Sequence, residues 1–338
     1  MPEVTLIPGD GIGPDVISAA RRVLDSVTSS IVWDEVEAGI EAFNKHGTAV
    51  PQQVLDSLRR TRVGLKGPMG NTKTGYLSPN TEIRREMGLW CNLRIATHFE
   101  GSTSQHLGTE IVVIRDVTED VSRGVQQMVG PDAGIGVKFI TRGSAERVAR
   151  FTYRYATEHL YKRVTIPNYA PSNRTTDGLF LSTALTVAQE FPELVVDEEA
   201  VDSLSMHLAM RPQAYAVLLC SNLYGGILCG LAAGLIGSVG LMPGANLDGE
   251  GTAVFEAGHG SAPKYAGLNK VNPTGMILSG AMLLEHIGES DAAAHVRQAV
   301  AHVIREGAHV TYDLGGSSTT SDMADAIITS LQQPALSS

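Results

Sequence analysis

The sequence lacks most of the features that mark a secreted, membrane-bound or nucleic-acid-binding protein. Its three cysteines, Cys91, Cys220 and Cys229, stand in apolar surroundings without zinc-type spacing, which indicates a reduced, cytoplasmic protein. No apolar run reaches the roughly 18 residues of a membrane-spanning helix, and the first residues lack the basic and apolar regions of a secretory signal. A formal net charge of -10 argues against nucleic acid or an anionic membrane as partner.

What is present predicts a globular α/β protein. The 338 residues are 43% apolar and 18% charged, enough for a large core in one or two domains. Val4–Ile7 is a short β-rich run, Pro8–Gly13 is a glycine turn, and a helical pattern follows to Leu24. Strand, turn and helix in this order indicate the βα unit of a parallel sheet. The glycines of the turn either cradle phosphate or simply make a tight turn.

The stretch Phe255–Pro273, FEAGHGSAPKYAGLNKVNP, is the most informative part of the chain. It places small residues and a proline around His259, with Lys264 and Tyr265 directly after them. Small residues allow a ligand to approach the backbone closely, and His, Lys and Tyr can stack on a flat ring or pair with phosphate. The residues alone leave two interpretations open, a nucleotide site and an ordinary surface loop.

Three arginines follow predicted helix or strand ends. Ser78 is a candidate N-cap for a helix that starts at Pro79 and presents Arg84, Arg94 ends an apolar run, and Arg115 closes the strand Glu110–Ile114. Because the guanidinium fork binds carboxylate bidentately, the set suits a small molecule with several carboxylates. Spacing alone favours the plainer interpretation, three surface arginines.

These motifs resemble the isocitrate/isopropylmalate dehydrogenases, the β-decarboxylating hydroxyacid dehydrogenases. HGSAPKYAG and VNP resemble the family's cofactor loop, and PGDGIGPDV resembles the first residues of the family's sequences. The resemblance extends over nearly the whole chain. The resemblance implies a two-lobed α/β fold that is not a Rossmann fold and has no GxGxxG fingerprint. It implies a large cofactor-binding lobe of residues 1–99 plus 250–338. It also implies a small lobe of residues 100–249, whose segment Gly124–Arg142 holds an arm that contacts a second protomer.

The resemblance also implies two binding sites. The positions that grip the carboxylates of the hydroxyacid are Ser78, Asn80, Arg84, Arg94 and Arg115. The positions that bind the dinucleotide are Thr72, Asn222, His259, Gly260, Ser261, Ala262, Pro263, Lys264, Tyr265, Val271, Asn272 and Tyr312. Lys264, Tyr265 and Tyr312 match contacts to the 2′-phosphate in NADP-type relatives, so NADP is the expected cofactor. Gly316 stands where those relatives carry an arginine.

The residues of the chemical step depart from the family pattern. The family's NLFGDILSD reads NLYGGILCG here, so that Gly226 and Gly230 replace two metal-binding aspartates, while Asp202 matches the third. The family lysine corresponds to Tyr169 and the family tyrosine to Ser122. The catalytic candidates are therefore Tyr169, Ser122 and Asp202, and one carboxylate with water holds Mg²⁺ or Mn²⁺ poorly, so no divalent metal is expected. Tyr169 or the thiol of Cys229 can donate a proton.

Three functions remain open from the sequence. The first is a repurposed enzyme that keeps a di- or tricarboxylate ligand and NADP but performs metal-independent oxidoreductase, lyase or decarboxylase chemistry. The second is a non-catalytic regulatory or binding homologue, and the third is conventional NADP-dependent oxidative decarboxylation. A homodimer is expected, with the apolar run Leu231–Gly240 as a self-complementary contact. The alternative is a hetero-oligomer with a catalytic partner.

Overall fold

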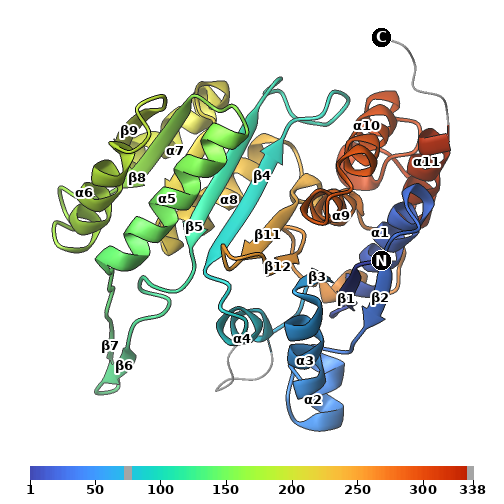
Figure 1. The fold of residues 1–338 in the computed structure, drawn as a ribbon, viewed down its shortest axis with the longest axis horizontal. Coiled ribbons are helices and arrows are strands. Elements are labelled where there is room, and N and C mark those ends of the chain that lie inside the picture. Colours follow the sequence, from blue (N-terminus) through green and yellow to red (C-terminus); the bar gives the residue numbers. More distant parts are fainter. Residues whose placement is uncertain (72–77, 333–338) are drawn as a thin grey trace. The chain divides into compact units, whose positions relative to one another are not determined.

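The computed structural model describes residues 1–71 and 78–332, which form two compact units (Figure 1). Unit 1 comprises residues 1–89, 97–107 and 236–338, and unit 2 comprises residues 90–96 and 108–235. The family resemblance placed the boundaries at 99/100 and 249/250. The observed division assigns residues 90–96 to unit 2 and residues 97–107 and 236–249 to unit 1.

The strands of unit 1 lie in the order β2-β1-β3-β12-β11. β1 pairs in parallel with β2 and β3, β3 pairs in parallel with β12, and β11 runs antiparallel to β12. Four consecutive residues of β1 and all of β3 and β12 are buried, as expected for strands that are covered on both faces. The bounds are β1 Glu3–Ile7, β2 Val32–Glu35, β3 Val63–Lys66, β11 Gly244–Leu247 and β12 Ala253–Phe255.

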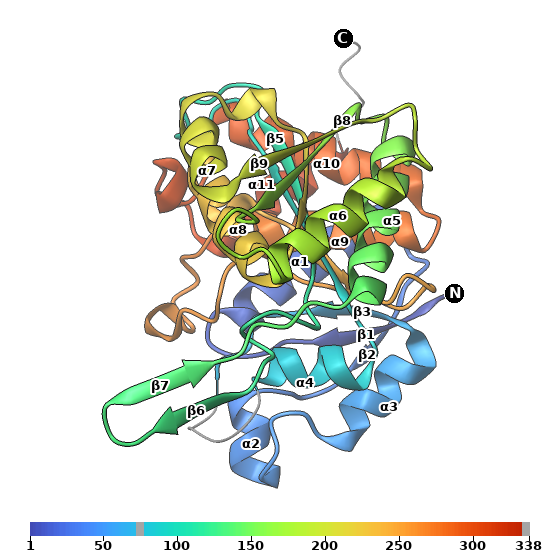
Figure 2. The ribbon, with the colours of Figure 1, turned by 90° about the vertical axis from the view of Figure 1, so that its left-hand side faces the viewer.

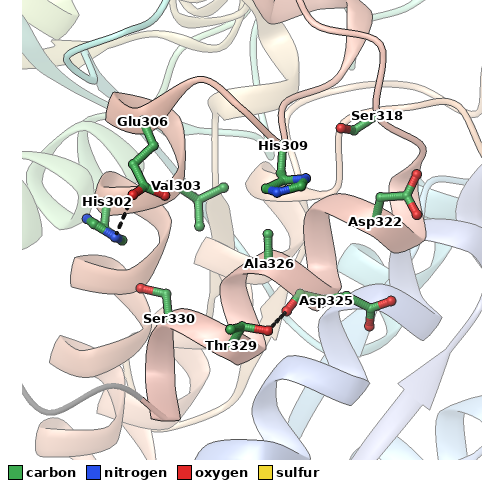
Figure 3. Close-up of a pocket in the computed structure, with 10 residues that line it drawn as sticks. All are labelled: His302, Val303, Glu306, His309, Ser318, Asp322, Asp325, Ala326, Thr329 and Ser330. Carbon is green, nitrogen blue, oxygen red and sulfur yellow. Dashed lines mark hydrogen bonds and ion pairs between the residues drawn. The ribbon is translucent and has the colours of Figure 1, made fainter.

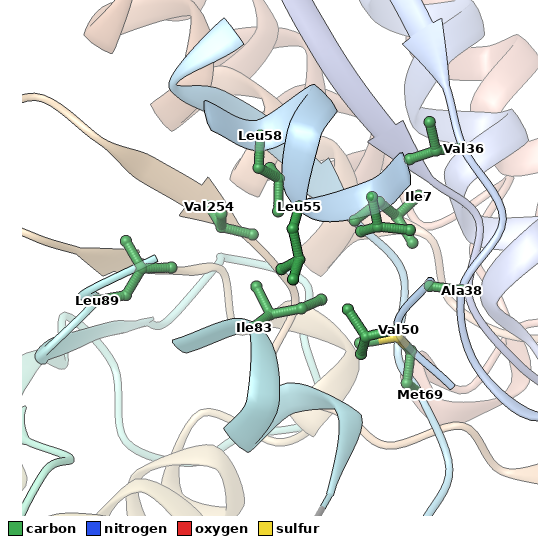
Figure 4. Packing of buried hydrophobic residues seen from close by; sticks show 11 residues of the cluster. Ile7, Val36, Ala38, Val50, Leu55, Leu58, Met69, Ile83, Leu89 and Val254 are labelled. Atoms are coloured by element: carbon green, nitrogen blue, oxygen red, sulfur yellow. The ribbon is translucent and has the colours of Figure 1, made fainter. Parts of the chain in front are cut away.

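The helices of unit 1 pack in two groups. α1 and α9–α11 pack against one another, and α9, which is buried along most of its length, contacts β3, β11 and β12. α3 lies over β1 and β3 above an apolar cluster that includes Leu55, Leu58 and Ile83 (Figure 4). The bounds are α1 Gly13–Val27, α2 Ile40–His46, α3 Gln52–Thr61, α4 Pro79–Glu86, α9 Thr274–His286, α10 Ser290–Glu306 and α11 Thr320–Gln332.

Unit 2 has its own strands in the order β4-β5-β10-β8-β9, and β5, β10, β8 and β9 are parallel. α5 and α6 contact each other and lie in front of the strands in Figure 1, whereas α7 and α8 lie behind them. The strands are β4 Cys91–Thr97, β5 Glu110–Asp116, β8 Arg163–Asn168, β9 Val195–Ala200 and β10 Val217–Cys220. The helices are α5 Arg142–Glu158, α6 Thr176–Ala188, α7 Val201–Met210 and α8 Asn222–Leu235.

A two-stranded hairpin projects from unit 2 within the segment expected to form an arm (Figure 2). It pairs β6 Gln126–Val129 with β7 Ala133–Gly136, and all eight of these residues are exposed. Met128 is 65% exposed and Ile135 is 46% exposed. Because an isolated hairpin is marginally stable in water, these apolar side chains are suited to contact another chain.

The run Leu231–Gly240, which the sequence analysis predicts as a self-complementary contact between protomers, is partly buried within the chain, whereas Gly234 and Val239 are exposed. Ala232, Ala233 and Leu235 are buried residues of α8, and Ile236 and Gly240 are buried beyond it. Apolar side chains are instead exposed at Leu223 and Ile227 on α8 and at Met206 and Met210 on α7. The buried residues of the run pack within the chain, and its exposed residues remain available for the predicted contact. None of the helices found in residues 1–71 and 78–332 is long and apolar enough to cross a membrane.

The packing of α3 gives a stability prediction. Leu58 is fully buried, and its Cδ2 atom would lie 2.8 Å from a Cβ added at Gly64 of β3. Leu58→Ala should lower the free energy of unfolding by about 2–5 kcal/mol, because it removes buried methyl groups and leaves a cavity. Arg59→Ala on the same helix loses only a surface ion pair with Asp56 and should change it by less than about 1 kcal/mol. Urea titration of both variants followed by circular dichroism tests this, and equal shifts would contradict the assignment.

Candidate functional site

Two glycine-containing loops of unit 1 that were expected to bind the cofactor contact each other. The backbone N–H of Ile12 donates to the carbonyl oxygen of Ser261 at 3.0 Å. Gly11 has φ +61°, and a Cβ at this position would lie 1.9 Å from the same oxygen. Only glycine therefore fits here, so the glycine turn after β1 holds the HGSAP loop in place. Ala262 also adopts a left-handed conformation, with φ 35°.

Lys264, Tyr265 and Tyr312, the residues expected at the 2′-phosphate, lie together on unit 1. The ring centroids of Tyr265 and Tyr312 are 6.0 Å apart, and Lys264 Nζ is 4.9 Å from the Tyr265 ring centroid. Lys270, which the sequence analysis did not select, lies with its Nζ 5.2 Å from the Tyr312 ring centroid. A hydrogen bond from Tyr312 and the charge of Lys264 lower the pKa of Tyr265. Two ammonium groups beside two phenols suit a phosphate monoester.

Gly316, where NADP-type relatives carry an arginine, has no room for a side chain because the backbone lies too close. A Cβ at Gly316 would lie 2.0 Å from the carbonyl oxygen of Val310, and the Gly316 N–H donates to the Thr311 carbonyl at 3.1 Å. A side chain at residue 316 therefore requires the turn to rearrange. Any extra cation at a phosphate in this place has to come from elsewhere, and Lys270 is one such group.

The remaining predicted cofactor residues differ in accessibility. Gly260 is exposed and a Cβ there would meet nothing within 4 Å, which leaves room for a ligand. Val271 and Asn272 are buried. The Asn272 side chain donates to Asp313 at 3.0 Å and accepts from the Thr274 N–H at 2.9 Å, so its amide helps to start α9 and does not face solvent. Thr72 lies outside the described residues.

On unit 1, the expected carboxylate-binding residues Ser78, Asn80 and Arg84 all lie on or next to α4. Ser78 occupies the N-cap position, as the sequence suggested, but its side chain makes no capping hydrogen bond. Asn80 Oδ1 accepts from Lys66 Nζ at 2.9 Å. Arg84 donates from Nε to Asn246 Oδ1 at 2.8 Å and from Nη2 to Glu256 Oε1 at 3.0 Å.

Behind these residues lies a buried ion pair that the sequence analysis missed. Lys66 Nζ and Glu256 Oε2 are 2.6 Å apart, and their side chains are 3% and 7% exposed. Lys66 ends β3 and Glu256 follows β12. The sequence feature that could have indicated the pair is therefore a charged residue at the end of each of two apolar strands. Losing either partner would leave a buried charge uncompensated, so the two side chains hold each other in place. Because they also bond to Asn80 and Arg84, the pair fixes these two residues. Glu256 also gives Arg84 a carboxylate partner within the chain.

On unit 2, Arg115, Asn222 and Ser122 come together. Arg115 donates from Nε to Asn92 Oδ1 at 3.1 Å and from Nη1 to the Asn222 carbonyl oxygen at 3.0 Å. Asn222, the first residue of α8, donates from Nδ2 to Ser122 Oγ at 3.1 Å. Burial raises the pKa of the Cys229 thiol and keeps it protonated, although the charges of Arg115 and of Arg94, which is 8% exposed on β4, oppose this shift.

Tyr169 and Asp202 occupy other parts of unit 2. Tyr169 is 39% exposed, and its N–H donates to Asp177 Oδ2 at 2.9 Å. Asp177 is buried and also accepts from the hydroxyl of Tyr224 at 2.7 Å and pairs with Lys138, so a buried network positions the Tyr169 loop. Asp202 is exposed in the first turn of α7 and accepts from the Ser203 N–H at 2.8 Å.

The residues of unit 2 do not fit a divalent metal at α8. α8 carries no charged side chain, and the space of a side chain at Gly226 lies 2.7 Å from Arg115 Nη1. Across residues 1–71 and 78–332, no group of three or more His, Cys, Asp or Glu side chains is arranged to hold a metal ion. The guanidinium of Arg115 therefore lies beside the place where the side chain of a metal-binding aspartate at residue 226 would start.

A separate cavity of about 630 Å³ lies between the end of α10 and α11 on unit 1 (Figure 3). Its lining contains two imidazoles, from His302 and His309, and the carboxylates of Glu306, Asp322 and Asp325. Asp325 is paired with Arg22, and His302 lies 3.4 Å from Glu306. The residues that line it include none of the predicted site residues.

Comparisons with known proteins agree with the resemblance. The family model for isocitrate/isopropylmalate dehydrogenase matches residues 3–327. The NAD isocitrate dehydrogenase catalytic subunit 5 of Arabidopsis thaliana is 38% identical over 324 residues, 96% of this chain and 87% of that protein. A mitochondrial regulatory subunit of the NAD isocitrate dehydrogenase of Dictyostelium discoideum is 35% identical over 96% of this chain and 91% of that protein.

A solved structure also matches along the whole chain. The crystal structure of isocitrate dehydrogenase from Methylococcus capsulatus is 41% identical and superposes with a TM-score of 0.94, covering 98% of this chain and 100% of that one. Sequence and structure therefore agree on the α/β fold predicted from the motifs. The chain belongs to the isocitrate/isopropylmalate dehydrogenase family.

Proposed function

We propose that this protein binds a small polycarboxylate and NADP without a divalent metal, and that the chemistry it performs is metal-independent. The observation that carries the proposal is the Arg115 guanidinium, which lies 2.7 Å from the side-chain position of Gly226. The relatives whose names give an activity are isocitrate dehydrogenases. The proposal retains a carboxylate ligand, but it takes NADP in place of the NAD named for the Arabidopsis thaliana relative and omits a metal-dependent step.

The physical basis of the proposal is that different residues carry out ligand binding and the metal-dependent chemical step. In oxidative decarboxylation a divalent metal stabilises the oxygen that gains negative charge, a contribution of several kcal/mol. Gly226 and Gly230 supply no ligand for such an ion. Arg84, Arg94 and Arg115 supply positive charge and N–H donors for carboxylates, and neither of these depends on a metal.

Other residues of the chain would position the ligand-binding side chains and carry a proton. Lys66 and Glu256 hold Asn80 and Arg84 in place on unit 1. Tyr169 presents an exposed phenol that can hold or release a proton, on a loop anchored by Asp177. NADP, when bound along the HGSAP loop, supplies hydride transfer.

A second candidate is a non-catalytic binding protein. It is supported by the regulatory relative of Dictyostelium discoideum, which at 35% identity is nearly as similar to this chain as the catalytic relative of Arabidopsis thaliana at 38%. Under this function the ligands are the same and turnover is absent.

The metal prediction concerns the unmodified protein. With isocitrate, NADP⁺ and excess Mn²⁺, NADPH formation should be lower than in a conventional family member by at least about 10⁴-fold, because the metal and the proton-transfer pair are both replaced. Binding of a tricarboxylate should be the same in EDTA and in Mn²⁺ when measured by calorimetry. Rapid turnover that depends on Mn²⁺ would refute the proposal, and absence of turnover with every carboxylate and NADPH would favour the non-catalytic candidate.

The cofactor prediction concerns the lysine and tyrosine cluster. NADP⁺ should bind more tightly than NAD⁺, and Lys264→Ala and Lys270→Ala should each weaken NADP⁺ binding about 3- to 10-fold, because each removes a charge beside the 2′-phosphate. NAD⁺ affinity should change little in both variants. Lys45→Ala on the exposed face of α2 is the control for a general change of surface charge. Equal affinity of the parent for both nucleotides, by calorimetry, would contradict the assignment.

The association prediction concerns the hairpin β6–β7. We propose a homodimer, because Met128, Ile135 and their apolar neighbours are exposed on a hairpin that is not stable alone. The parent should have twice the chain mass in light scattering at micromolar concentration. Met128→Lys together with Ile135→Lys should shift it toward the monomer, whereas Gln126→Lys together with Gln127→Lys should not. A monomeric parent would exclude the homodimer, and association only with a different chain would support the hetero-oligomer.

A further inference from the structure

We infer that the cavity between the end of α10 and α11 binds a linear aliphatic polyamine, whose ammonium groups pair with carboxylates on its two walls. The inference goes beyond the proposed function and does not depend on it. The cavity belongs to unit 1, and its lining shares no residue with the predicted carboxylate and cofactor positions. Its volume of about 630 Å³ is within the range of small-molecule sites.

The carboxylates of the lining come from two helices. Glu306 is the last residue of α10, whereas Asp322 and Asp325 lie in the first half of α11. Figure 3 shows Glu306 and Asp322 at opposite sides of the lining, with the apolar side chains of Val303 and Ala326 between them. Two anionic walls with an apolar surface between them suit a ligand that has a cation at each end and a hydrocarbon chain in the middle.

Two of these carboxylates have no lysine or arginine partner among the described residues. Asp325 pairs with Arg22 of α1, whereas Glu306 faces an imidazole and Asp322 accepts from the Thr319 N–H at 3.0 Å. The hydroxyl and the N–H of Thr319 lower the pKa of Asp322, so this carboxylate is ionised at neutral pH. Glu306 and Asp322 are therefore left to pair with cations of a ligand.

The imidazole beside Glu306 does not neutralise it. Arg305 Nη2 and His302 Nδ1 are 3.3 Å apart, and because a guanidinium can only donate, His302 Nδ1 is the acceptor. The proton of the ring is then on Nε2, which lies 3.4 Å from Glu306 Oε1. In this arrangement the ring is uncharged, and the negative charge of Glu306 stays available to the cavity.

The other polar groups of the lining can accept hydrogen bonds from an ammonium group. Ser318, Thr329 and Ser330 contribute hydroxyl groups, and the Thr329 hydroxyl donates to the Asp325 carbonyl oxygen at 2.8 Å, which leaves its own oxygen as an acceptor. The ring of His309 is exposed, and one of its nitrogens accepts when the ring is unprotonated. Acceptors thus accompany the carboxylates, as the three N–H donors of an ammonium group require.

The spread of the carboxylates favours a polyamine over a divalent metal ion. A single ion needs several oxygen or nitrogen ligands at one point. In residues 1–71 and 78–332, no three or more His, Cys, Asp or Glu side chains are arranged in that way. A flexible chain with several ammonium groups can instead reach carboxylates that lie apart.

The test uses spermidine, titrated by calorimetry into the full-length protein in physiological salt. The parent should bind it saturably. Glu306→Gln and Asp322→Asn should each weaken binding about 3- to 10-fold, because each removes a carboxylate charge while keeping the size of the side chain. Asp291→Asn, in the exposed first turn of α10 and outside the lining, removes the same charge and should change the affinity by less than about 2-fold. 1-Aminobutane, which has one ammonium group, should bind at least about 10-fold more weakly than spermidine.

The outcomes distinguish a site in the cavity from a general attraction of cations to an acidic chain. Equal weakening by all three variants would show that only net charge matters and would overturn the inference. Unchanged affinity in both cavity variants, or no saturable binding by the parent, would do the same. Equal affinity for 1-aminobutane and spermidine would contradict the pairing with two walls. Spermidine should also raise the midpoint of thermal unfolding more in the parent than in the cavity variants. Failure of these results leaves the proposed function untouched, because carboxylate and NADP binding are measured separately.

Discussion

The buried ion pair between Lys66 and Glu256 is the constraint on which the positions of Asn80 and Arg84 in unit 1 depend. Two charges that are less than one-tenth exposed have to satisfy each other, because neither is solvated. Lys66 also donates to Asn80 and to the Gly67 carbonyl oxygen, and Glu256 also pairs with Arg84, so two polar residues of α4 are held by groups on β3 and after β12. Arg84 is accordingly ordered by the protein before any ligand binds, which lowers the entropy lost on binding.

In unit 2, an arginine side chain packs against glycine residues of a helix. Arg115 lies against Gly225 and Gly226 and bonds to two asparagines, Asn92 and Asn222. Amide and carbonyl oxygens thus orient the guanidinium of Arg115. Arg84 is oriented by the carboxylate of Glu256, which it shares with Lys66.

The sequence predicted the α/β fold and the principal site segments because those features are local. Glycine turns after strands, the helix that starts at Pro79 and the HGSAP loop are all readable from neighbouring residues, and the structure has them where expected. The sequence could not show the pair of Lys66 and Glu256, whose members are 190 residues apart and join only through the packing of β12 on β3. It likewise could not show that Asn272 and much of Leu231–Gly240 are buried within the chain, since an apolar or polar side chain looks the same in a sequence whether it is buried or exposed.

Loss of the metal ligands and retention of the arginines are compatible on electrostatic grounds. Two aspartates and a divalent cation together carry no formal charge, and neither do two glycines. The long-range field that the carboxylates of a ligand experience is therefore set by the arginines in both cases, so their attraction for an anion survives the replacement. What disappears is the short-range effect of the metal on one oxygen as it gains charge, which lowers the barrier of the reaction. Under the proposed function, Gly226 and Gly230 remove the metal-dependent reaction, while Arg115 keeps the class of ligand.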